Sequence, residues 1–157
     1  MKAFWLSLTA AALVLSAGNA FSATPKEAAA IVRAVSAVTN AVQFYKDNGK
    51  ENAIAEFNNP KGRFNFMELY ILAYDTNGTL IAEPRNKSLV GRHLLNIPDV
   101  EGKLYVKAIV DMATERGKGS VSYHFENPDT DAVELRWIYL QRVDNVIICC
   151  VLPLRAE

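Results

Sequence analysis

The sequence is poor in the residues that most often carry catalysis or bind metal ions. Its 157 residues include two histidines, His93 and His124, and two adjacent cysteines, Cys149 and Cys150. No Gly-x-Ser-x-Gly, His-Glu-x-x-His or Cys-x-x-Cys motif occurs, and no glycine-rich phosphate-binding loop. We therefore predict that the protein is not an enzyme and has no catalytic residues, no metal site and no cofactor. The alternative is an enzyme without a recognisable motif, whose turnover would depend on His93 or Glu83.

The cysteines are too few and too close together for a disulfide-rich domain. Neighbouring residues of a β-strand point to opposite faces, and a disulfide prefers Cα atoms about 5.5 Å apart. We therefore expect Cys149 and Cys150 to be two buried or half-buried thiols, with a redox switch or a metal site as the alternative.

The chain also lacks an excess of charge of either sign. Lys and Arg total 17, as do Asp and Glu, so the formal net charge is zero with histidine neutral. Proteins that bind nucleic acid usually carry a basic excess, so we expect no nucleic-acid partner. Half of the residues are hydrophobic and 22% are charged, which excludes a disordered chain, and the length favours one domain.

A long hydrophobic run is missing everywhere except at the beginning of the chain. Met1-Lys2 is positively charged, residues 3–17 are apolar or small, and three small or polar residues follow. This pattern is typical of a secretory signal peptide, and the run is shorter than the about 20 residues that span a membrane. We predict a signal peptide over 1–23, cleaved at a point between residues 20 and 23, and one mature domain over 24–157. An uncleaved anchor is the alternative.

The beginning of the mature chain carries strong helix signals. Thr24, Pro25 and Glu27 form a capping box with proline at the first helical position. Apolar residues then recur at spacings of three and four, namely Ile31, Val35, Val38, Val42 and Tyr45. The pattern predicts a long helix that ends at Gly49 and a short second helix over 51–57. The apolar stripe either packs on the chain's own sheet or forms a helix–helix dimer seam.

The rest of the chain predicts a sheet and one more helix. We expect strands over 66–74, 79–83, 120–126, 133–143 and 146–152, and a helix over 102–115. Asn77-Gly78 is a strong hairpin signal, and Asp99 is placed to cap the later helix. The polar segment over 84–100 is long for a passive connection and is of the kind that lines sites. Hairpin connections favour an antiparallel sheet, so the fold class is α+β, with a long N-terminal helix packed on five strands.

Arg136 is the most informative candidate for a binding residue. It lies in the middle of a predicted strand, where a buried guanidinium is costly unless a partner satisfies it. A guanidinium matches a carboxylate through two parallel hydrogen bonds, so a small organic anion is a natural ligand. The simpler interpretation is an ion pair with Glu134, Glu126 or Glu83.

Aromatic and basic residues elsewhere can complete such a site. Tyrosine hydroxyls orient a carboxylate while the rings exclude water, although core packing is the simpler role for each ring. The candidate ligand-binding residues are Tyr70, Arg92, His93, Tyr123, Arg136, Trp137 and Tyr139. Arg92 and His93 lie on the long segment, where they either close over a ligand or face solvent. Strand alternation places Arg136 on the opposite face from Trp137 and Tyr139, and the sequence leaves open which face lines the pocket.

Five stretches in a fixed order carry a family resemblance. They are 57–64 (FNNPKGRF), 69–84 (LYILAYDTNGTLIAEP), 89–94 (LVGRHL), 123–128 and 136–144. Together they resemble the single Cache domain family, type 2, whose members are extracytoplasmic sensing domains with a PAS-like fold. The resemblance implies a PAS-like domain with the long helix under the sheet. It also implies a pocket for small carboxylates or amino acids on the other face, beneath the loop and helix between the second and third strands.

The resemblance implies an exported sensor, periplasmic or secreted in a bacterium, that signals to a membrane receptor or kinase. The family frequently has His-Pro where this chain has Glu83-Pro84, so an acid stands near the pocket in place of an imidazole. No signalling module follows before Glu157, so we expect a free-standing protein. The alternative is a protein-interaction module that forms a homodimer through the N-terminal helix and binds no small ligand.

Overall fold

The protein is built around a five-stranded antiparallel sheet with the strand order β2-β1-β5-β4-β3. The computed structural model describes residues 24–66, 68–127 and 130–154. Its elements are α1 (Pro25–Phe57), β1 (Tyr70–Asp75), β2 (Leu80–Ala82), the 3₁₀ helix η1 (Lys87–Leu89), α2 (Tyr105–Arg116), β3 (Lys118–Glu126), β4 (Val133–Val143) and β5 (Val146–Leu154). The predicted α+β fold is therefore confirmed, whereas the predicted signal peptide lies outside the described residues.

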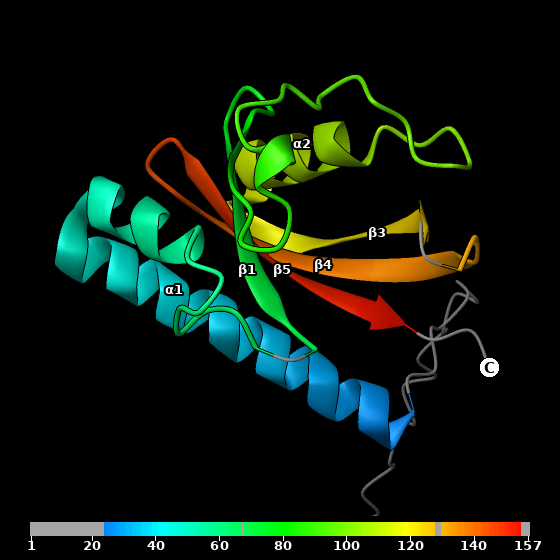
Figure 1. Ribbon diagram of the computed structural model, residues 1–157, viewed down its shortest axis with the longest axis horizontal. Coiled ribbons are helices and arrows are strands. Elements are labelled where there is room, and N and C mark those ends of the chain that lie inside the picture. Colours follow the sequence, from blue (N-terminus) through cyan, green and yellow to red (C-terminus); the bar gives the residue numbers. More distant parts are fainter. Residues whose placement is uncertain (1–23, 67, 128–129, 155–157) are drawn as a thin grey trace, which may run out of the picture.

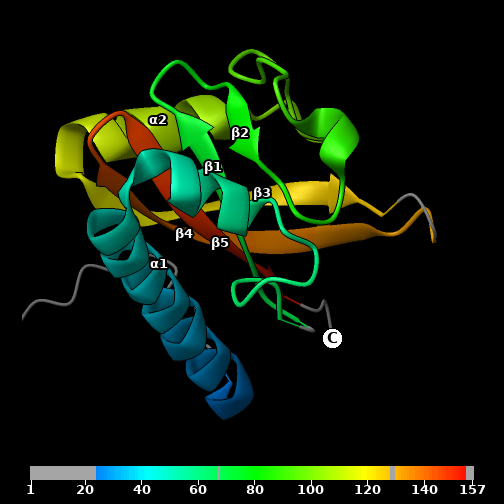
Figure 2. The ribbon, with the colours of Figure 1, turned by 60° about the vertical axis from the view of Figure 1, so that its left-hand side comes forward.

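The sheet is covered on both faces. Helix α1 lies along one face, and α2 together with the long segment between β2 and α2 lies over the other (Figure 1, Figure 2). Each face has its own hydrophobic core, which we call the α1 side and the α2 side. None of the described helices combines the length and hydrophobicity needed to cross a membrane.

Helix α1 begins and bends where its sequence directs. The Glu27 backbone N–H donates to Thr24 Oγ1 at 3.2 Å, and the Thr24 N–H donates to Glu27 Oε2 at 2.8 Å, so the capping box is complete. At Gly49 the backbone leaves helical geometry with a φ of +79°, which glycine tolerates without strain. A second helical segment then runs to Phe57, as the sequence predicts.

The apolar stripe of α1 packs on the chain's own sheet. Val38, Val42 and Tyr45 are buried in the α1-side core together with Ile148 and Cys150 of β5. The intramolecular interpretation of the stripe is therefore confirmed at these positions. Strand β5 is central, and nearly all its side chains are buried on both faces.

The two cysteines separate as strand alternation requires. Cys149 belongs to the α2-side core and Cys150 to the α1-side core, and both are buried free thiols. Burial raises the pKa of Cys150 to about 12 and raises that of Cys149 as well, which keeps both protonated at neutral pH.

Element boundaries differ from the predictions at two informative places. Strand β1 begins at Tyr70 rather than at Phe66, and the Phe66 N–H donates to the Leu69 carbonyl at 2.8 Å just before it. Helix α2 begins at Tyr105 with Leu104 as its N-cap, so the prediction that Asp99 caps this helix is wrong. Asp99 instead binds backbone N–H groups of its own loop and of β3.

Candidate functional site: an aromatic chamber around Arg136

The two faces of β4 separate the candidate residues. Arg136 and Ile138 lie on the α2 side, where Ile138 is part of the core. Trp137 and Tyr139 pack against the α1-side core, and their rings stack with centroids 6.1 Å apart. The structure therefore does not bring Trp137 and Tyr139 together with Arg136, because successive residues of a strand point to opposite faces.

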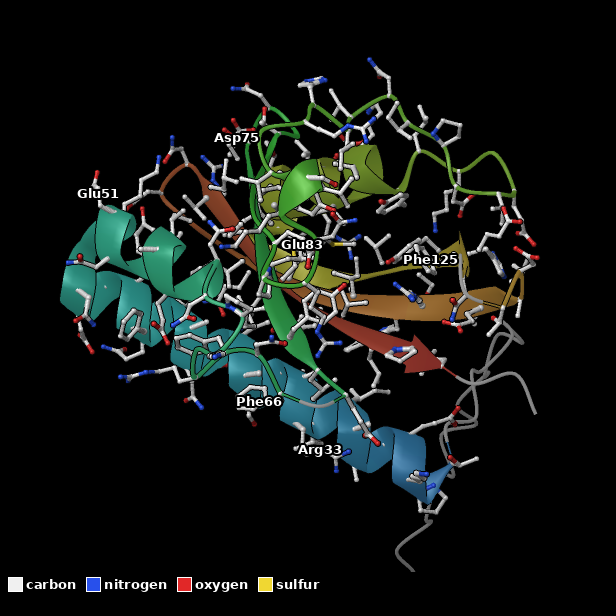
Figure 3. All side chains as sticks on the ribbon, viewed as in Figure 1. Arg33, Glu51, Phe66, Asp75, Glu83 and Phe125 are labelled. Carbon is white, nitrogen blue, oxygen red and sulfur yellow. The ribbon has the colours of Figure 1, made fainter. Side chains whose placement is uncertain are left out.

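Five side chains on the α2 side form what we call the aromatic chamber: Tyr70, Tyr105, Tyr123, Phe125 and Arg136. Tyr123 of β3 is paired directly with Arg136 of β4, so their side chains share one face. Tyr105 begins α2 and stacks on Tyr123, with ring centroids 4.2 Å apart and planes at 10°. Tyr70 lies in β1, in the sheet row that continues through Val151 and Ile138. Figure 3 shows Phe125 on the α2 side, and Arg33 and Phe66 beside α1 on the other side.

The guanidinium of Arg136 is held in the chamber but is incompletely bonded. Its Cζ lies 3.4 Å from the centroid of the Phe125 ring, in cation–π geometry. Its Nη2 lies 3.4 Å from Glu134 Oε2, a long contact for a charged pair. Its Nε is buried and has no hydrogen-bond partner. Buried donors are almost always bonded, so this atom marks a place where an acceptor belongs.

The Glu134 carboxylate, which contacts Arg136, is itself held by a second residue. Glu134 Oε1 accepts a hydrogen bond of 2.9 Å from Asn127 Nδ2. The ion-pair interpretation of Arg136 is thus realised with Glu134, although the pair leaves the guanidinium with bonding capacity.

The tyrosines of the chamber are neutral hydrogen-bond donors at neutral pH. Burial raises the pKa of Tyr70 to about 12, with a further rise from Glu83 and opposing effects from Arg136 and Arg85. Burial likewise raises the pKa of Tyr105 and of Tyr123. Their hydroxyl groups can therefore donate to a carboxylate or keto oxygen.

A buried carboxylate and a second guanidinium border the chamber. Glu83 is 5% exposed, and its Oε1 accepts a hydrogen bond of 3.0 Å from the Arg85 backbone N–H. Burial raises the pKa of Glu83, while the N–H groups of Arg85 and Asn86 and the charges of Arg85 and Arg136 oppose the rise. The guanidinium of Arg85 lies over the Tyr70 ring, 4.1 Å from its centroid.

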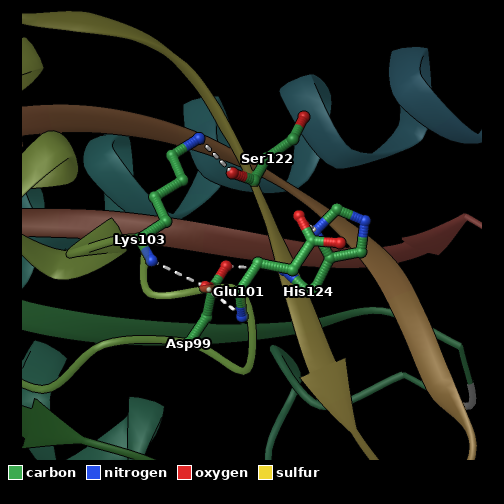
Figure 4. A network of polar contacts seen from close by, with 5 residues as sticks. All are labelled: Asp99, Glu101, Lys103, Ser122 and His124. Carbon is green, nitrogen blue, oxygen red and sulfur yellow. Dashed lines mark hydrogen bonds and ion pairs between the residues drawn. The ribbon is translucent and has the colours of Figure 1, made fainter.

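A polar network fixes the segment before α2 to the edge of β3 (Figure 4). Asp99 Oδ1 accepts from the N–H groups of Glu101 and Lys103 at 3.0 and 2.8 Å, and Oδ2 accepts from the His124 N–H at 2.9 Å. Lys103 Nζ donates to the Ser122 carbonyl at 2.5 Å, and His124 Nδ1 lies 3.0 Å from Glu101 Oε2. These contacts flank Tyr123, so they hold Tyr105 over it.

The charge state of Asp99 follows from these contacts. Desolvation works to raise the pKa of Asp99, but the backbone N–H groups of His124, Lys103 and Glu101 outweigh it and the pKa is lowered. The carboxylate is therefore ionised at neutral pH, as its role of acceptor requires.

Arg92 and His93 lie at another place on the molecule. The Leu80 N–H donates to the Arg92 carbonyl at 3.0 Å, and His93 forms an isolated bridge with Thr79, so this segment runs along β2. Both side chains are exposed. Strand β2 is at the opposite end of the sheet from β3, which places the pair away from Arg136.

Sequence reasoning missed two contributors to the site. Arg85 follows directly after Glu83-Pro84, and Tyr105 begins α2. Their contacts depend on how the long segment folds back over the sheet, which no short-range pattern specifies. Glu83 was visible in the sequence as an acid at a position where the family frequently has histidine, and Phe125 lies in a strand that the sequence predicts.

Two open grooves lie on the α1 side. One of about 670 Å³ is lined by Val32, Phe66 and Leu69 and is crossed by an exposed Arg33–Glu68 ion pair of 3.9 Å. The other, of about 440 Å³, lies between the start of α1 and the end of β5. Exposed ion pairs contribute little binding energy, so we place the candidate site at the aromatic chamber, where charge is buried. Within the described ranges, no three His, Cys, Asp or Glu side chains are grouped as a metal site.

Comparison with known proteins assigns the fold to a family. Residues 18–149 match the family described as single Cache domain 2. The chain belongs to this family. No curated protein matches the chain.

Solved Cache-type structures share the fold. A structure described as "Structural basis for carboxylic acid recognition by a Cache chemosensory domain" has a TM-score of 0.68 and 19% identity over 85% of this chain and 100% of that one. A methyl-accepting chemotaxis protein from Vibrio parahaemolyticus has a TM-score of 0.65 and 17% identity, over 80% of this chain and 89% of that one. A periplasmic sensor domain of a chemotaxis protein has a TM-score of 0.62 and 18% identity, over 82% and 92%.

These likenesses confirm the PAS-like Cache fold. At such low identity the neighbours show the architecture and not the ligand. The chain is a Cache sensor domain, similar in fold to periplasmic domains of chemotaxis proteins.

Proposed function

We propose that this Cache domain is an exported sensor that binds a small organic anion in the aromatic chamber and signals to a membrane partner. Residues 1–23 serve as the signal peptide in this proposal. The ligand's carboxylate binds Arg136, and the hydroxyls of Tyr70, Tyr105 and Tyr123 orient it. Arg92, His93, Trp137 and Tyr139 are not part of the proposed site, because they lie elsewhere.

One observation carries the proposal. The Nε atom of Arg136 is buried without a hydrogen-bond partner, and the carboxylate of Glu134 lies 3.4 Å from Nη2 of the same guanidinium. A carboxylate bound through Nε and one Nη atom supplies the missing acceptor in the geometry that a guanidinium prefers. The named carboxylic acid recognition of one Cache neighbour is consistent with this ligand class.

Signalling requires that the ligand favour one state of the protein over another. The segment over 99–103 is fixed to β3 by polar contacts at its edge, and these contacts flank Tyr123 of the chamber. A ligand that contacts Tyr123 and Tyr105 therefore favours one position of α2 over others. We propose that the partner recognises the surface that α2 presents in that position.

Titration calorimetry with C2 to C4 monocarboxylates and small amino acids tests the binding site. We expect at least one member of the series to bind, and we expect Arg136→Met to weaken that binding at least about thirtyfold, because a bidentate charge-assisted contact is lost. Methionine keeps most of the side-chain length on Phe125 and removes the charge.

The matched control is Arg142→Met on the same strand. Arg142 is exposed, and its Nε donates to the Asp144 carbonyl at 2.8 Å, at the far end of β4 from Arg136. Binding by this variant is expected to equal that of the wild type. Absence of binding by the whole series, or equal binding by Arg136→Met, contradicts the proposal.

A further inference from the structure

The guanidinium of Arg136 has one edge formed by Nε and Nη2. The N–H of Nε and one N–H of Nη2 are parallel, and a carboxylate binds such an edge through two hydrogen bonds in the plane of the group. The Phe125 ring covers a face of the guanidinium, with Cζ 3.4 Å from its centroid. Nε is buried without a hydrogen-bond partner, whereas Nη2 lies 3.4 Å from Glu134 Oε2. Glu134 therefore contacts one of the two atoms that a ligand carboxylate needs.

Strand pairing and the β3–β4 turn fix the position of Glu134. Glu134 and Arg136 are two residues apart on β4, so their side chains share the α2 side. Glu134 is paired with Phe125 of β3, the residue on which the guanidinium lies. Its Oε1 accepts from Asn127 Nδ2 at 2.9 Å, and the Asn127 N–H donates to the Ala132 carbonyl at 2.9 Å. A donor anchored in the turn therefore holds the carboxylate beside Nη2.

The contact between Glu134 and Arg136 is weak enough to be replaced. Charged N–H···O hydrogen bonds are usually about 2.7–2.9 Å long, so a separation of 3.4 Å leaves part of the attraction unused. The side chain of Glu134 is 31% exposed, against 18% for Arg136. A carboxylate that leaves Nη2 can therefore be hydrated, whereas the buried Nε needs an acceptor inside the chamber. A ligand that makes two short hydrogen bonds along this edge can replace the long contact.

We propose that Glu134 is an internal competitor of the ligand and sets the affinity of the chamber: its carboxylate lies beside Arg136 until the ligand's carboxylate displaces it. This inference rests on the proposed function and names what regulates the same site. Two carboxylates beside one guanidinium repel each other. Part of the free energy of ligand binding therefore offsets the loss of the Glu134–Arg136 contact, and removal of the Glu134 charge should raise the affinity.

Calorimetry with acetate, propionate and butyrate on the full mature protein tests the competition in Glu134→Gln. Glutamine keeps the length of the side chain and can still accept from Asn127 Nδ2, but it carries no negative charge. We expect this variant to bind the acids at least about tenfold more tightly than the wild type. The matched control is Glu126→Gln, which removes one charge from an exposed position of the same hairpin, on the opposite face from Phe125. It should bind within about twofold of the wild type.

The variant Glu134→Asp separates the contact from the charge. Aspartate keeps the negative charge but is one methylene shorter, so its carboxylate withdraws from Nη2. Competition by contact predicts that Glu134→Asp binds the acids more tightly than the wild type and less tightly than Glu134→Gln. Adding Glu134→Gln to Arg136→Met shows whether the gain depends on the guanidinium. The double variant should bind no more tightly than Arg136→Met alone.

The outcomes separate this inference from the proposed function. Equal or weaker binding by Glu134→Gln would show that Glu134 has no effect or positions Arg136 for the ligand, and would overturn the inference. Wild-type affinity in Glu134→Asp, or a gain of affinity in the double variant, would overturn it too. In these cases binding that depends on Arg136 would still support the proposed function. Failure of the three acids to bind either the wild type or Glu134→Gln would overturn the inference, and the proposed function falls with it once small amino acids also fail to bind.

Discussion

At the scale of single residues, the site depends on charged groups that the fold has buried wholly, as at Glu83, or in part, as at Arg136. Arg136 was identifiable from the sequence because an arginine in a central strand demands a partner. Its environment was not, since Tyr105 and Arg85 reach the chamber only when the long segment folds over the sheet. The sequence also predicted that side chains of β4 alternate between the two faces of the sheet. It did not show which of these faces packs against α1, because that depends on where the whole helix docks.

Glu83 gives a prediction for stability against pH. Burial raises its pKa in the folded protein above the ordinary value of 4.5. The folded state therefore holds this proton more tightly than the unfolded state, and the resulting stabilisation is complete below pH 4.5 and is lost as pH rises through the folded pKa. Glu83→Gln does not titrate, so its stability relative to wild type should rise between pH 4 and pH 7.

Urea unfolding at the two pH values measures this difference. The exposed Glu126→Gln variant serves as the reference, and its difference from wild type should change less between the two pH values. A relative stability of Glu83→Gln that stays constant or falls toward pH 7 would show that the carboxylate is not held in a desolvated place.

At the scale of elements, helix α1 was the most predictable part of the chain. The capping box, the apolar stripe and the glycine break are all local signals, and the structure follows each of them. The start of α2 was less predictable, because Asp99 had two possible uses. An aspartate can cap a helix or bind loop N–H groups, and the approach of β3 decided between them.

Burial of the α1 stripe leads to a prediction for Val38→Asp. Val38 is fully buried against the sheet, so an aspartate there should lower the free energy of unfolding by at least about 3 kcal/mol. Asn40→Asp, at an exposed position of the same helix, should change it by no more than about 0.5 kcal/mol. Chemical denaturation followed by circular dichroism gives both values.

Gel filtration of the same two variants addresses the alternative role of the helix. A Val38→Asp protein that keeps its stability and only dissociates from an oligomer would show that the stripe is an intermolecular seam. The packing of Val38 in the α1-side core predicts loss of the fold instead.

At the scale of the whole molecule, the hydrophobic cores on the two faces of the sheet differ in composition. The α1 side packs alanines, aliphatic residues and aromatic rings of the long helix and the sheet against one another. The α2 side combines aliphatic residues with the tyrosines and Arg136, under a segment held by polar contacts. The sheet architecture and the sensor family were predictable from motifs in a fixed order. Which residues line the aromatic chamber was not, because it depends on how the strands and the long segment are placed in three dimensions.

The most direct test of the account is a crystal structure of the mature protein grown with a saturating concentration of whichever acid of the C2 to C4 series binds it most tightly. The account predicts one molecule of that acid on the α2 side, with its carboxylate within hydrogen-bond distance of Arg136 Nε. An aromatic chamber without the acid, or the acid bound only in the grooves beside α1, would contradict the account.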